Sequence, residues 1–226
     1  PLRLEDEPAL NHLRAPGRTC LRALASGGNG TIEAPENDSK GCGGVMRVAP
    51  VGLVRQWTAA ECFQFGAQTA AITHGHSTGF LSSGAMAFII RKIVDGTHPN
   101  AASRLSLLEL ENWADHGETS EAIKRVLLLI EENAPATPMT IKSLGEGWIA
   151  EEALAIGLFS ALASQSFSDA ICLAANHSGD SDSTASIAGQ IYGAWHGADG
   201  IPANWVSQLD VFDPLDRLIE DFLAVG

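Results

Sequence analysis

The spacing of apolar residues is the feature that most constrains the fold of this 226-residue chain. From Thr58 onward, apolar side chains recur three and four residues apart, which is the period of one face of an α-helix. No stretch of useful length alternates apolar and polar residues as a half-buried strand does. The pattern predicts an all-α fold in one compact domain over residues 1–226, with no internal repeat.

Local signals set the ends of the expected helices. Thr58 and Glu61 form a capping-box pair before an apolar run. Ser77 is expected to cap the following helix, and Pro202 to occupy the first position of a short one. The expected helices cover residues 16–24, 58–73, 77–95, 101–116, 120–133, 148–162 and 168–176, a short segment from 202 and a last helix from 213.

The composition excludes several classes of protein. A formal net charge of −13 argues against a surface that binds nucleic acid. No apolar run reaches the roughly 18 residues that span a membrane, and no signal-peptide pattern opens the chain. The four cysteines lack the spacing of a metal site and are expected to be reduced thiols of a cytoplasmic protein. Cys20, Cys62 and Cys172 are expected to have packed surroundings, and Cys42, between glycines, is the exception.

An acidic turn near the C-terminus carries the strongest chemical signal. Residues 176–184 include two carboxylates, Asp180 and Asp182, and the hydroxyl of Ser183. One interpretation is helix capping, because Asp and Ser are preferred at N-caps and acidic groups suit the positive end of the helix dipole. The other is a hard-cation site, because two nearby carboxylates repel unless a cation or proton lies between them. Spacing alone leaves both open.

The segment after this turn has small residues four apart, at Ala185, Gly189, Gly193 and Gly197. Four-residue spacing places them on one helix face. Glycine inside a helix costs roughly 1 kcal/mol relative to alanine, so a packing reason is expected. The stripe predicts a buried helix whose face another backbone approaches closely.

Two upstream stretches add candidate ligand groups. Lys40–Pro50 contains Gly41, Gly43 and Gly44, which allow either a sharp turn with glycine φ angles or backbone N–H donors to a ligand. Residues 73–76 read Thr-His-Gly-His, in which His74 either hydrogen-bonds the carbonyls of a helix end or reaches a substrate.

Other polar and aromatic side chains receive structural interpretations. His76 and His177 are expected to be structural, because no His–Cys spacing supports zinc. Arg47 is expected to be a buried partner of a carboxylate. The tryptophans are expected to lie in the core: Trp148, Trp195 and Trp205.

Taken in order, the stretches at 40–50, 73–76 and 179–189 resemble the ADP-ribosylglycohydrolase family, from about Arg14 to Trp205. The resemblance implies a compact orthogonal helix bundle. It also implies two Mg²⁺ ions, with Mn²⁺ in some members, and cleavage of the N- or O-glycosidic bond that joins ADP-ribose to a protein side chain.

The resemblance assigns roles residue by residue. The family's Asp-x-Asp-Thr/Ser metal ligands fall on Asp180, Asp182 and Ser183. Its glycine loop, which contacts ADP-ribose, falls on Gly41-Cys42-Gly43 and continues to Gly44, and its Thr-His position falls on His74. Cys42 stands where the family usually has Asn, and so lacks an amide group.

Part of the family pattern has no counterpart in these residues. A Gly-Asp-Ala-x-Gly stretch and a Thr-Asp-Asp-Thr stretch usually supply further metal ligands and the acidic catalytic residue. The chain resembles the C-terminal two-thirds of a family member, and its opening Pro1–Glu7 carries no initiator Met. We therefore expect the catalytic acid to lie upstream of Pro1.

These observations support three hypotheses. The first is a Mg²⁺-dependent, monomeric hydrolase that removes ADP-ribose from a modified protein, with arginine as the expected linkage and no nucleic-acid or membrane partner. The second, motivated by the missing carboxylates, is a catalytically impaired protein that binds ADP-ribose or serves as a structural family member. The third is a metal phosphohydrolase that acts on nucleotides.

Overall fold

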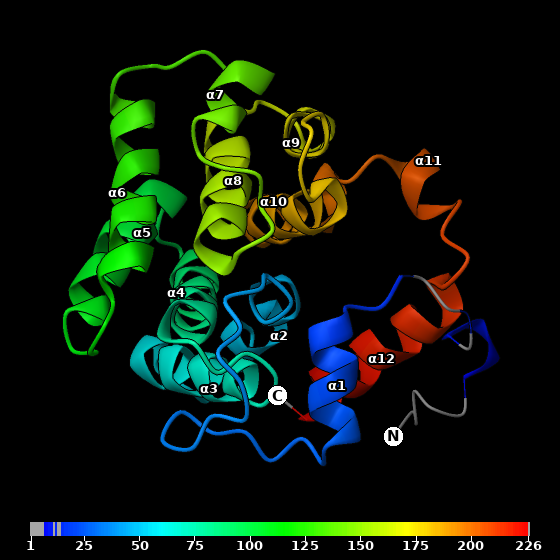
Figure 1. The fold of residues 1–226 in the computed structure, drawn as a ribbon. Coiled ribbons are helices and arrows are strands. Elements are labelled where there is room, and N and C mark those ends of the chain that lie inside the picture. The colour runs from blue at the N-terminus through cyan, green and yellow to red at the C-terminus, as the bar shows by residue number, and fades with distance from the viewer. Residues whose placement is uncertain (1–6, 11, 13–14, 226) are drawn as a thin grey trace.

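The computed structural model describes residues 7–10, 12 and 15–225, and over these residues the chain is helical (Figure 1). The prediction made for the opening Pro1–Asp6 lies outside the described residues. Within the described part, the extended chain forms a single isolated antiparallel bridge, between Gly41 and Ile149. The predicted all-α class is confirmed.

The elements follow one another in a fixed order along the chain. They are η2 (Pro8–Leu10), α1 (Arg18–Ala25), η3 (Val45–Arg47), α2 (Ala49–Gly52), α3 (Ala59–Ala71), α4 (Ser77–Val94), α5 (Pro99–Leu110), α6 (Gly117–Glu131), α7 (Pro138–Lys142), α8 (Ala150–Ala163), α9 (Phe167–Ala175), α10 (Ser181–His196), η4 (Ala198–Gly200), α11 (Ala203–Val206) and α12 (Phe212–Val225).

The sequence signals placed most helix starts within a residue or two. The capping box at Thr58 and Glu61 is present in full. Ser77 was the wrong cap for α4: the residue before it, His76, is extended, and its Nδ1 accepts the Thr78 N–H at 3.1 Å. Pro202 lies one position earlier than expected, at the N-cap of α11.

Helix α4 forms the centre of the bundle (Figure 1). All but three of its 18 residues are buried. Its small residues let α3 come close, because a Cβ added at Gly66 would lie 2.8 Å from the Ala87 Cβ, and one at Gly84 would lie 2.8 Å from the Phe63 ring. Helix α8 is similarly apolar on every side, as expected for a helix that neighbours cover all round.

Helix α10 packs against α8 and α9, but the stripe of small residues is not the cause of the closest approach. No described atom lies within 4 Å of a Cβ added at Gly193 or Gly197. The close contact is made by Gly157 of α8, where an added Cβ would lie 2.4 Å from the Ile187 Cγ2. The prediction of a close backbone at the stripe is therefore wrong for Gly193 and Gly197.

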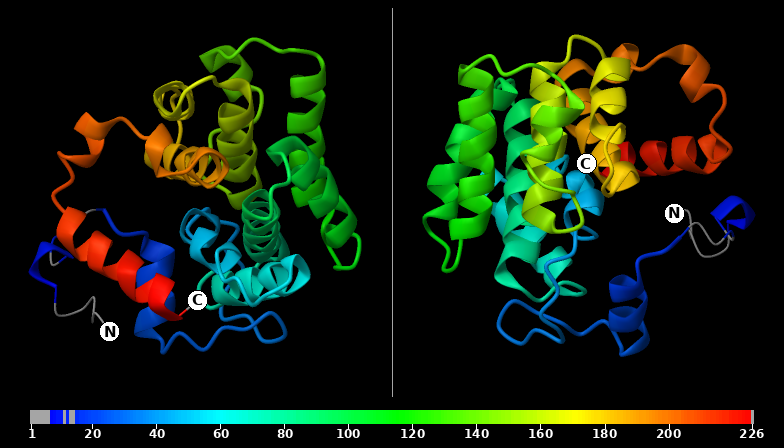
Figure 2. Two further views of the ribbon diagram at one scale, coloured as in Figure 1. Left: turned by 180° about the vertical axis from the view of Figure 1, so that it is seen from behind. Right: turned by 45° about the horizontal axis from the view of Figure 1, so that its top comes forward.

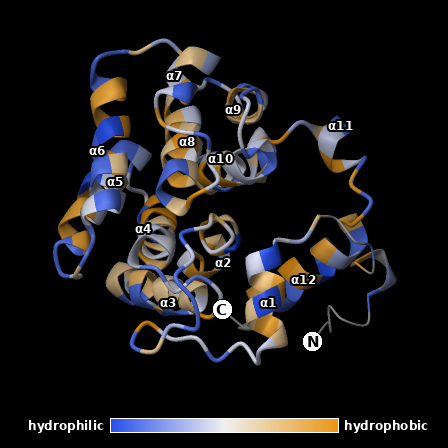
Figure 3. Ribbon diagram, viewed as in Figure 1, coloured by the Kyte–Doolittle hydropathy of each residue, from blue (hydrophilic) through white to orange (hydrophobic). Residues whose placement is uncertain are grey.

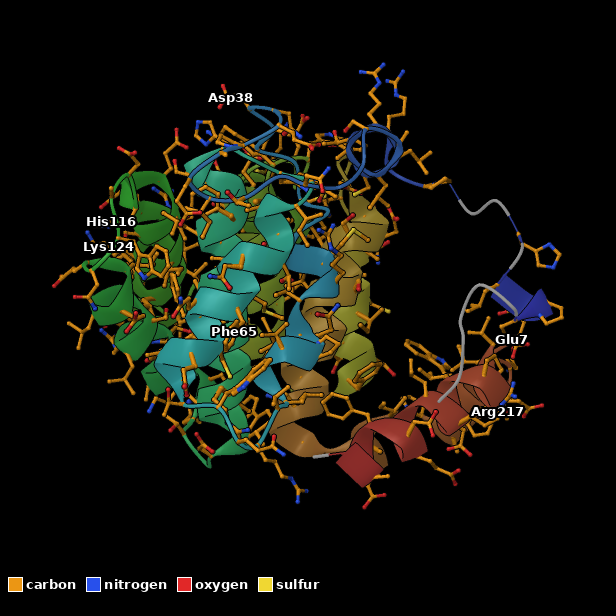
Figure 4. All side chains as sticks on the ribbon, turned by 90° about the horizontal axis from the view of Figure 1, so that it is seen from below. Glu7, Asp38, Phe65, His116, Lys124 and Arg217 are labelled. Atoms are coloured by element: carbon orange, nitrogen blue, oxygen red, sulfur yellow. The ribbon has the colours of Figure 1, made fainter. Side chains whose placement is uncertain are left out.

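The Gly193 face instead borders a groove with a volume of about 700 Å³, lined in part by Met46, Gln190 and Ile219. Ile219 belongs to α12, which lies at the periphery of the molecule (Figure 2, Figure 4). The first half of α12 is held to the N-terminal region by an ion pair between Arg217 Nη2 and Glu7 Oε2 at 2.5 Å.

The peripheral helices are amphipathic and leave apolar side chains exposed. On α1 these are Leu21 and Leu24, and on α12 they include Leu215, Ile219 and Leu223. Figure 3 shows the corresponding hydrophobic patches on both ribbons. Within the described part of the chain, no helix has the length and apolarity to cross a membrane.

The two glycine environments predict opposite effects of the same substitution. Gly157→Ala should lower the free energy of unfolding by about 1–3 kcal/mol, because the new methyl group overlaps Ile187. Gly193→Ala should raise it by up to about 1 kcal/mol, because alanine favours the helix and meets no neighbour. Urea unfolding of both variants measures the difference, and equal effects would contradict the packing described.

Candidate functional site

The glycine loop and the acidic turn meet, although 138 residues separate them in sequence. The Cys42 thiol donates to Asp180 Oδ2 at 3.0 Å, and both residues are 8% exposed. Nearby, the Ser183 hydroxyl lies 3.6 Å from the Met46 sulfur. Because the Asp180 side chain caps no N–H of α10, helix capping does not account for this carboxylate.

The backbone around Asp180 is fixed from several sides. Its N–H donates to the Glu146 carbonyl at 2.8 Å, and its carbonyl accepts from the Thr184 hydroxyl at 2.9 Å. Gly179 is required beside it, since an added Cβ would lie 1.8 Å from the Glu146 oxygen. His177 holds the other side of the turn, with Nε2 2.9 Å from Thr184 Oγ1. Both histidines predicted to be structural accept a backbone N–H through Nδ1, His76 from Thr78 and His177 from Gly179.

The three predicted metal ligands lie within four residues of one another but in different surroundings. Asp180 and Ser183 are buried and face the glycine loop, whereas Asp182 is exposed in the first turn of α10. Among the residues that the structure describes, no three His, Cys, Asp or Glu side chains gather closely enough to hold a metal ion. This chain thus offers a partial oxygen ligand set.

Glycine is needed at two positions of the loop because the His74 ring leaves no room for a side chain. Residues 42–44 form a turn, as one interpretation predicted, but none of Gly41, Gly43 and Gly44 has a positive φ, so the turn does not need glycine φ angles. A Cβ at Gly41 would lie 3.1 Å from His74 Nε2, and one at Gly43 would lie 2.9 Å from His74 Cε1. The loop therefore lies directly on the imidazole.

The backbone N–H groups of the loop differ in their hydrogen bonding, and Gly44 is buried whereas Gly43 is half-buried. The Gly41 N–H donates to Ser39 Oγ at 3.2 Å, and the Cys42 N–H to the Trp148 carbonyl at 3.2 Å. The N–H groups of Gly43 and Gly44 have no hydrogen-bond partner among the described residues. Adjacent free backbone donors are groups that bind anions such as phosphate.

His74 is 2% exposed, so its ring lies in the interior, beneath the glycine loop that packs on it. Its Nδ1 lies 2.8 Å from the Thr73 hydroxyl, which accepts from Arg47 Nη2 at 2.7 Å. Burial and, to a lesser extent, the positive charge of Arg47 lower the pKa of His74 from 6.5 to about 4. The ring is therefore neutral at physiological pH.

Arg47 was expected to be buried and to pair with a carboxylate, and both expectations are wrong. Its side chain belongs to an exposed residue, and its hydrogen bonds go to the Gly43 carbonyl at 2.8 Å, the Thr69 carbonyl at 3.1 Å and Thr73. Carbonyl oxygens at the loop and at the end of α3 take the place of the expected carboxylate. Arg47 thus ties the glycine loop to the segment that carries His74.

A short extended segment holds the other side of the loop. Cys42 N–H donates to the Trp148 carbonyl, and Ala150 N–H donates to the Lys40 carbonyl at 2.8 Å. Trp148 is 57% exposed and Trp205 is 37% exposed, so the prediction that both lie in the core is wrong. The Trp148 backbone, rather than core packing, holds this residue beside the loop. No sequence signal pointed to Trp148 as a neighbour of the site.

The cysteines also differ from expectation. All four are free thiols, as predicted, but Cys42 is buried and Cys172 is exposed. Burial is the largest of the causes that raise the pKa of Cys42 to about 12, followed by its hydrogen bond to Asp180. Cys42 therefore carries its proton at neutral pH.

Comparison with known proteins identifies the family. The sequence profile of the ADP-ribosylglycohydrolase family matches residues 4–226. The chain belongs to the ADP-ribosylglycohydrolase family. A solved structure described as an ADP-ribosylglycohydrolase-related protein complex superposes on 89% of the chain with a TM-score of 0.67 and 25% identity, and the chain covers 66% of it. The predicted ADP-ribosylglycohydrolase type of fold is confirmed.

Several relatives in this family have names that state an activity. ADP-ribosylarginine hydrolase Tri1 of Serratia proteamaculans is 24% identical over 92% of the chain, which covers 53% of that protein. ADP-ribosylhydrolase ARH3 of Mus musculus is 24% identical over 83% of the chain, which covers 57% of that protein. ADP-ribosyl-[dinitrogen reductase] glycohydrolase of Rhodospirillum rubrum is 23% identical over 93% of the chain, which covers 66% of that protein. The chain thus spans part of the length of these relatives.

The burial of the thiols predicts an order of chemical modification. Cys172 should react first with iodoacetamide, because it is exposed, whereas Cys42 should remain unmodified in the folded protein. Burial and the raised pKa both keep the Cys42 thiolate rare. Mass spectrometry of peptides after timed alkylation measures the order. Labelling of Cys42 as fast as Cys172 would contradict the buried contact with Asp180.

The lowered pKa of His74 predicts acid sensitivity. Between pH 6.5 and about 4 the unfolded state binds a proton that the folded state does not, so the free energy of unfolding falls as the pH drops. His74→Gln removes this contribution and should flatten the curve in that window. His12→Gln, at an exposed histidine, should retain the dependence of the unaltered protein. Urea unfolding across the window measures both, and an unchanged slope in His74→Gln contradicts the assignment.

Proposed function

We propose that this protein is a metal-dependent hydrolase that removes ADP-ribose from a modified protein side chain, with arginine as the linkage. The observation that carries the proposal is the meeting of the glycine loop, His74 and Asp180 at one place in the fold. Family membership and the relative named ADP-ribosylarginine hydrolase support the choice of substrate.

The residues at the acidic turn suit a hard cation. Asp180 and Asp182 offer carboxylate oxygens and Ser183 a hydroxyl, which are ligands that Mg²⁺ and Mn²⁺ accept. The Asp180 carboxylate accepts only the Cys42 thiol among the described side chains, so further ligand positions on it are open. A bound pair of such ions would supply positive charge to orient ribose hydroxyls and to acidify a water molecule.

The chain's own groups suit the anionic part of ADP-ribose. Gly43 and Gly44, whose N–H groups make no hydrogen bond to the described residues, follow Cys42 in the chain, and the Cys42 side chain contacts Asp180. Donors of this kind bind diphosphate oxygens without requiring lysine or arginine. That arrangement matters in a chain with a net charge of −13, because the backbone supplies the local positive potential.

The proposed reaction breaks the bond between the anomeric carbon of the ribose and the side-chain nitrogen. Positive charge develops on the sugar in an oxocarbenium-like transition state, and the negative charge of the Asp180 and Asp182 carboxylates would favour it electrostatically. Water adds to the anomeric carbon, and the leaving nitrogen takes up a proton. The products are free ADP-ribose and the unmodified side chain.

The test is release of ADP-ribose from a protein modified on arginine, measured by chromatography with Mg²⁺ or Mn²⁺ and with chelator. Asp182→Ala should lower release by roughly 100-fold or more, since loss of even an outer partner of a metal ligand costs 10–100-fold. Asp199→Ala, at an exposed aspartate of η4, is the matched control and should retain activity. Undiminished release by Asp182→Ala overturns the proposal.

A second function is favoured by the partial ligand set of the described residues. Because no three His, Cys, Asp or Glu side chains gather there closely enough to hold a metal ion, a protein that binds ADP-ribose without turnover is the main alternative. Calorimetry with ADP-ribose separates the two, since binding without release supports the alternative. Appearance of AMP or inorganic phosphate in the same assay would instead indicate a phosphohydrolase.

A further inference from the structure

An apolar groove lies beside Gly193 of α10, between the helix bundle and α12. Its volume is about 700 Å³, and its walls come from η3, α2, α4, α10, η4 and α12. Sites for small molecules have volumes of roughly 300–1,000 Å³, mostly apolar walls and a few polar groups, and many lie between helices. Because Ile219 of α12 lines the groove together with residues of the bundle, the space is bounded on more than one side, which suits a small molecule.

Apolar side chains along the groove are left in contact with water. Leu53 is 38% exposed and Ile219 is 48% exposed, while Met46 is half-buried. A Cβ added at Gly193 would have no described atom within 4 Å, so the groove is open at this part of α10. An alkyl chain in the groove would cover these side chains, and the burial of apolar surface would favour its binding. The flexible thioether of Met46 can adapt to such a chain.

The charge that borders the groove has the opposite sign to the net charge of the protein. The chain carries 27 acidic and 14 basic residues, yet the one charged residue among the described residues that line the groove is Arg47. Its Nη atoms donate to the Gly43 and Thr69 carbonyls and to the Thr73 hydroxyl, which are all neutral groups. Its Nε makes no hydrogen bond to the described residues, and none of their carboxylates pairs with it. An anionic group would therefore find an uncompensated positive charge here.

The wall that carries Met46 and Arg47 is fixed before any ligand arrives. Gln190 Nε2 donates to the Met46 carbonyl at 2.7 Å and to Ser186 Oγ at 2.9 Å, which ties η3 to α10. Arg47 ties the same segment to the glycine loop and to the end of α3. A ligand that enters a preformed groove does not have to order its walls, so less of the interaction free energy is lost.

We propose that this groove binds a small amphipathic carboxylate. Its unbranched alkyl chain lies along Met46, Gly193 and Ile219, and its carboxylate lies against Arg47. The chain matches the apolar walls, and the carboxylate supplies the anionic partner that Arg47 lacks among the described residues. The inference goes beyond the proposed function and is independent of it, because binding uses neither the acidic turn nor the N–H groups of the glycine loop.

Isothermal titration calorimetry of the full chain with decanoate tests the proposal. Decanoate should saturate at one equivalent and should bind on the order of tenfold or more tightly than 1-decanol or decylammonium, which lack the negative charge. Octanoate is two methylenes shorter and should bind roughly tenfold more weakly than decanoate, because each buried methylene contributes about fourfold in affinity.

Substitutions in the groove locate the binding site. Gly193→Leu places a side chain in the groove without meeting a described neighbour at its Cβ, and should weaken decanoate binding on the order of tenfold or more. Gly117→Leu is the matched control, because its Cβ also has no described atom within 4 Å and Gly117 lies outside this groove. Circular dichroism of each variant checks that the helices remain.

Substitutions of arginine test the role of the charge. Arg47→Met should abolish the preference for decanoate over 1-decanol while 1-decanol still binds, and Arg47→Lys should retain part of the preference. Arg125→Met, at an exposed arginine of α6, is the matched control and should retain the preference in full.

Several results would overturn the proposal. One is the absence of saturable binding, and another is equal affinity for decanoate, 1-decanol and decylammonium in the unaltered protein. Undiminished decanoate binding in Gly193→Leu, or an unchanged preference in Arg47→Met, also overturns it. An equal loss of affinity for decanoate and 1-decanol in Arg47→Met does so too, because the arginine would then support the groove rather than bind the carboxylate.

Discussion

Close packing between α3 and α4 is the constraint on which the rest of the structure depends. Gly66 and Gly84 allow the two backbones to approach, and the glycine loop then packs into the same pair of helices. A Cβ at Gly44 would lie 2.8 Å from both the Ala70 Cβ and Ser83 Oγ. The small residues of this helix pair therefore set the position of the loop as well as the core, and a larger side chain at Gly44 would displace the loop from the site.

The candidate site combines a neutral histidine, a protonated thiol and carboxylates. His74 is neutral because it is buried, and it serves as the surface on which Gly41 and Gly43 lie. Asp180 is buried against a thiol that keeps its proton. The charge that a ligand or cation would meet is therefore concentrated at the carboxylates of α10, while the loop offers backbone dipoles.

The helices could be predicted because their signals are local. The capping box at Thr58 and the apolar periodicity of α4 each lie within a few residues of the element they define. The contact between Cys42 and Asp180 could not be predicted from spacing, since it depends on how α8 and α10 bring distant segments together. The resemblance to the family did place both residues in one site.

The errors share a physical cause. The glycines of the stripe satisfied a helical period, but the period does not reveal whether a neighbour covers that face, and at Gly193 none of the described residues does. Arg47 was assigned a carboxylate because charged groups in apolar surroundings usually need one, yet carbonyls and Thr73 satisfy it. Both mistakes concern tertiary neighbours, which a single sequence does not specify.

The double attachment of the glycine loop has a consequence for the thermodynamics of recognition. Lys40 and Cys42 are hydrogen-bonded to the segment before α8, and Arg47 anchors the far end to Thr69 and Thr73. A loop restrained at both ends loses little conformational entropy when a ligand binds, so most of the interaction free energy remains as affinity. The loop geometry should therefore differ little between the free and the bound protein, and association should proceed without a slow ordering step.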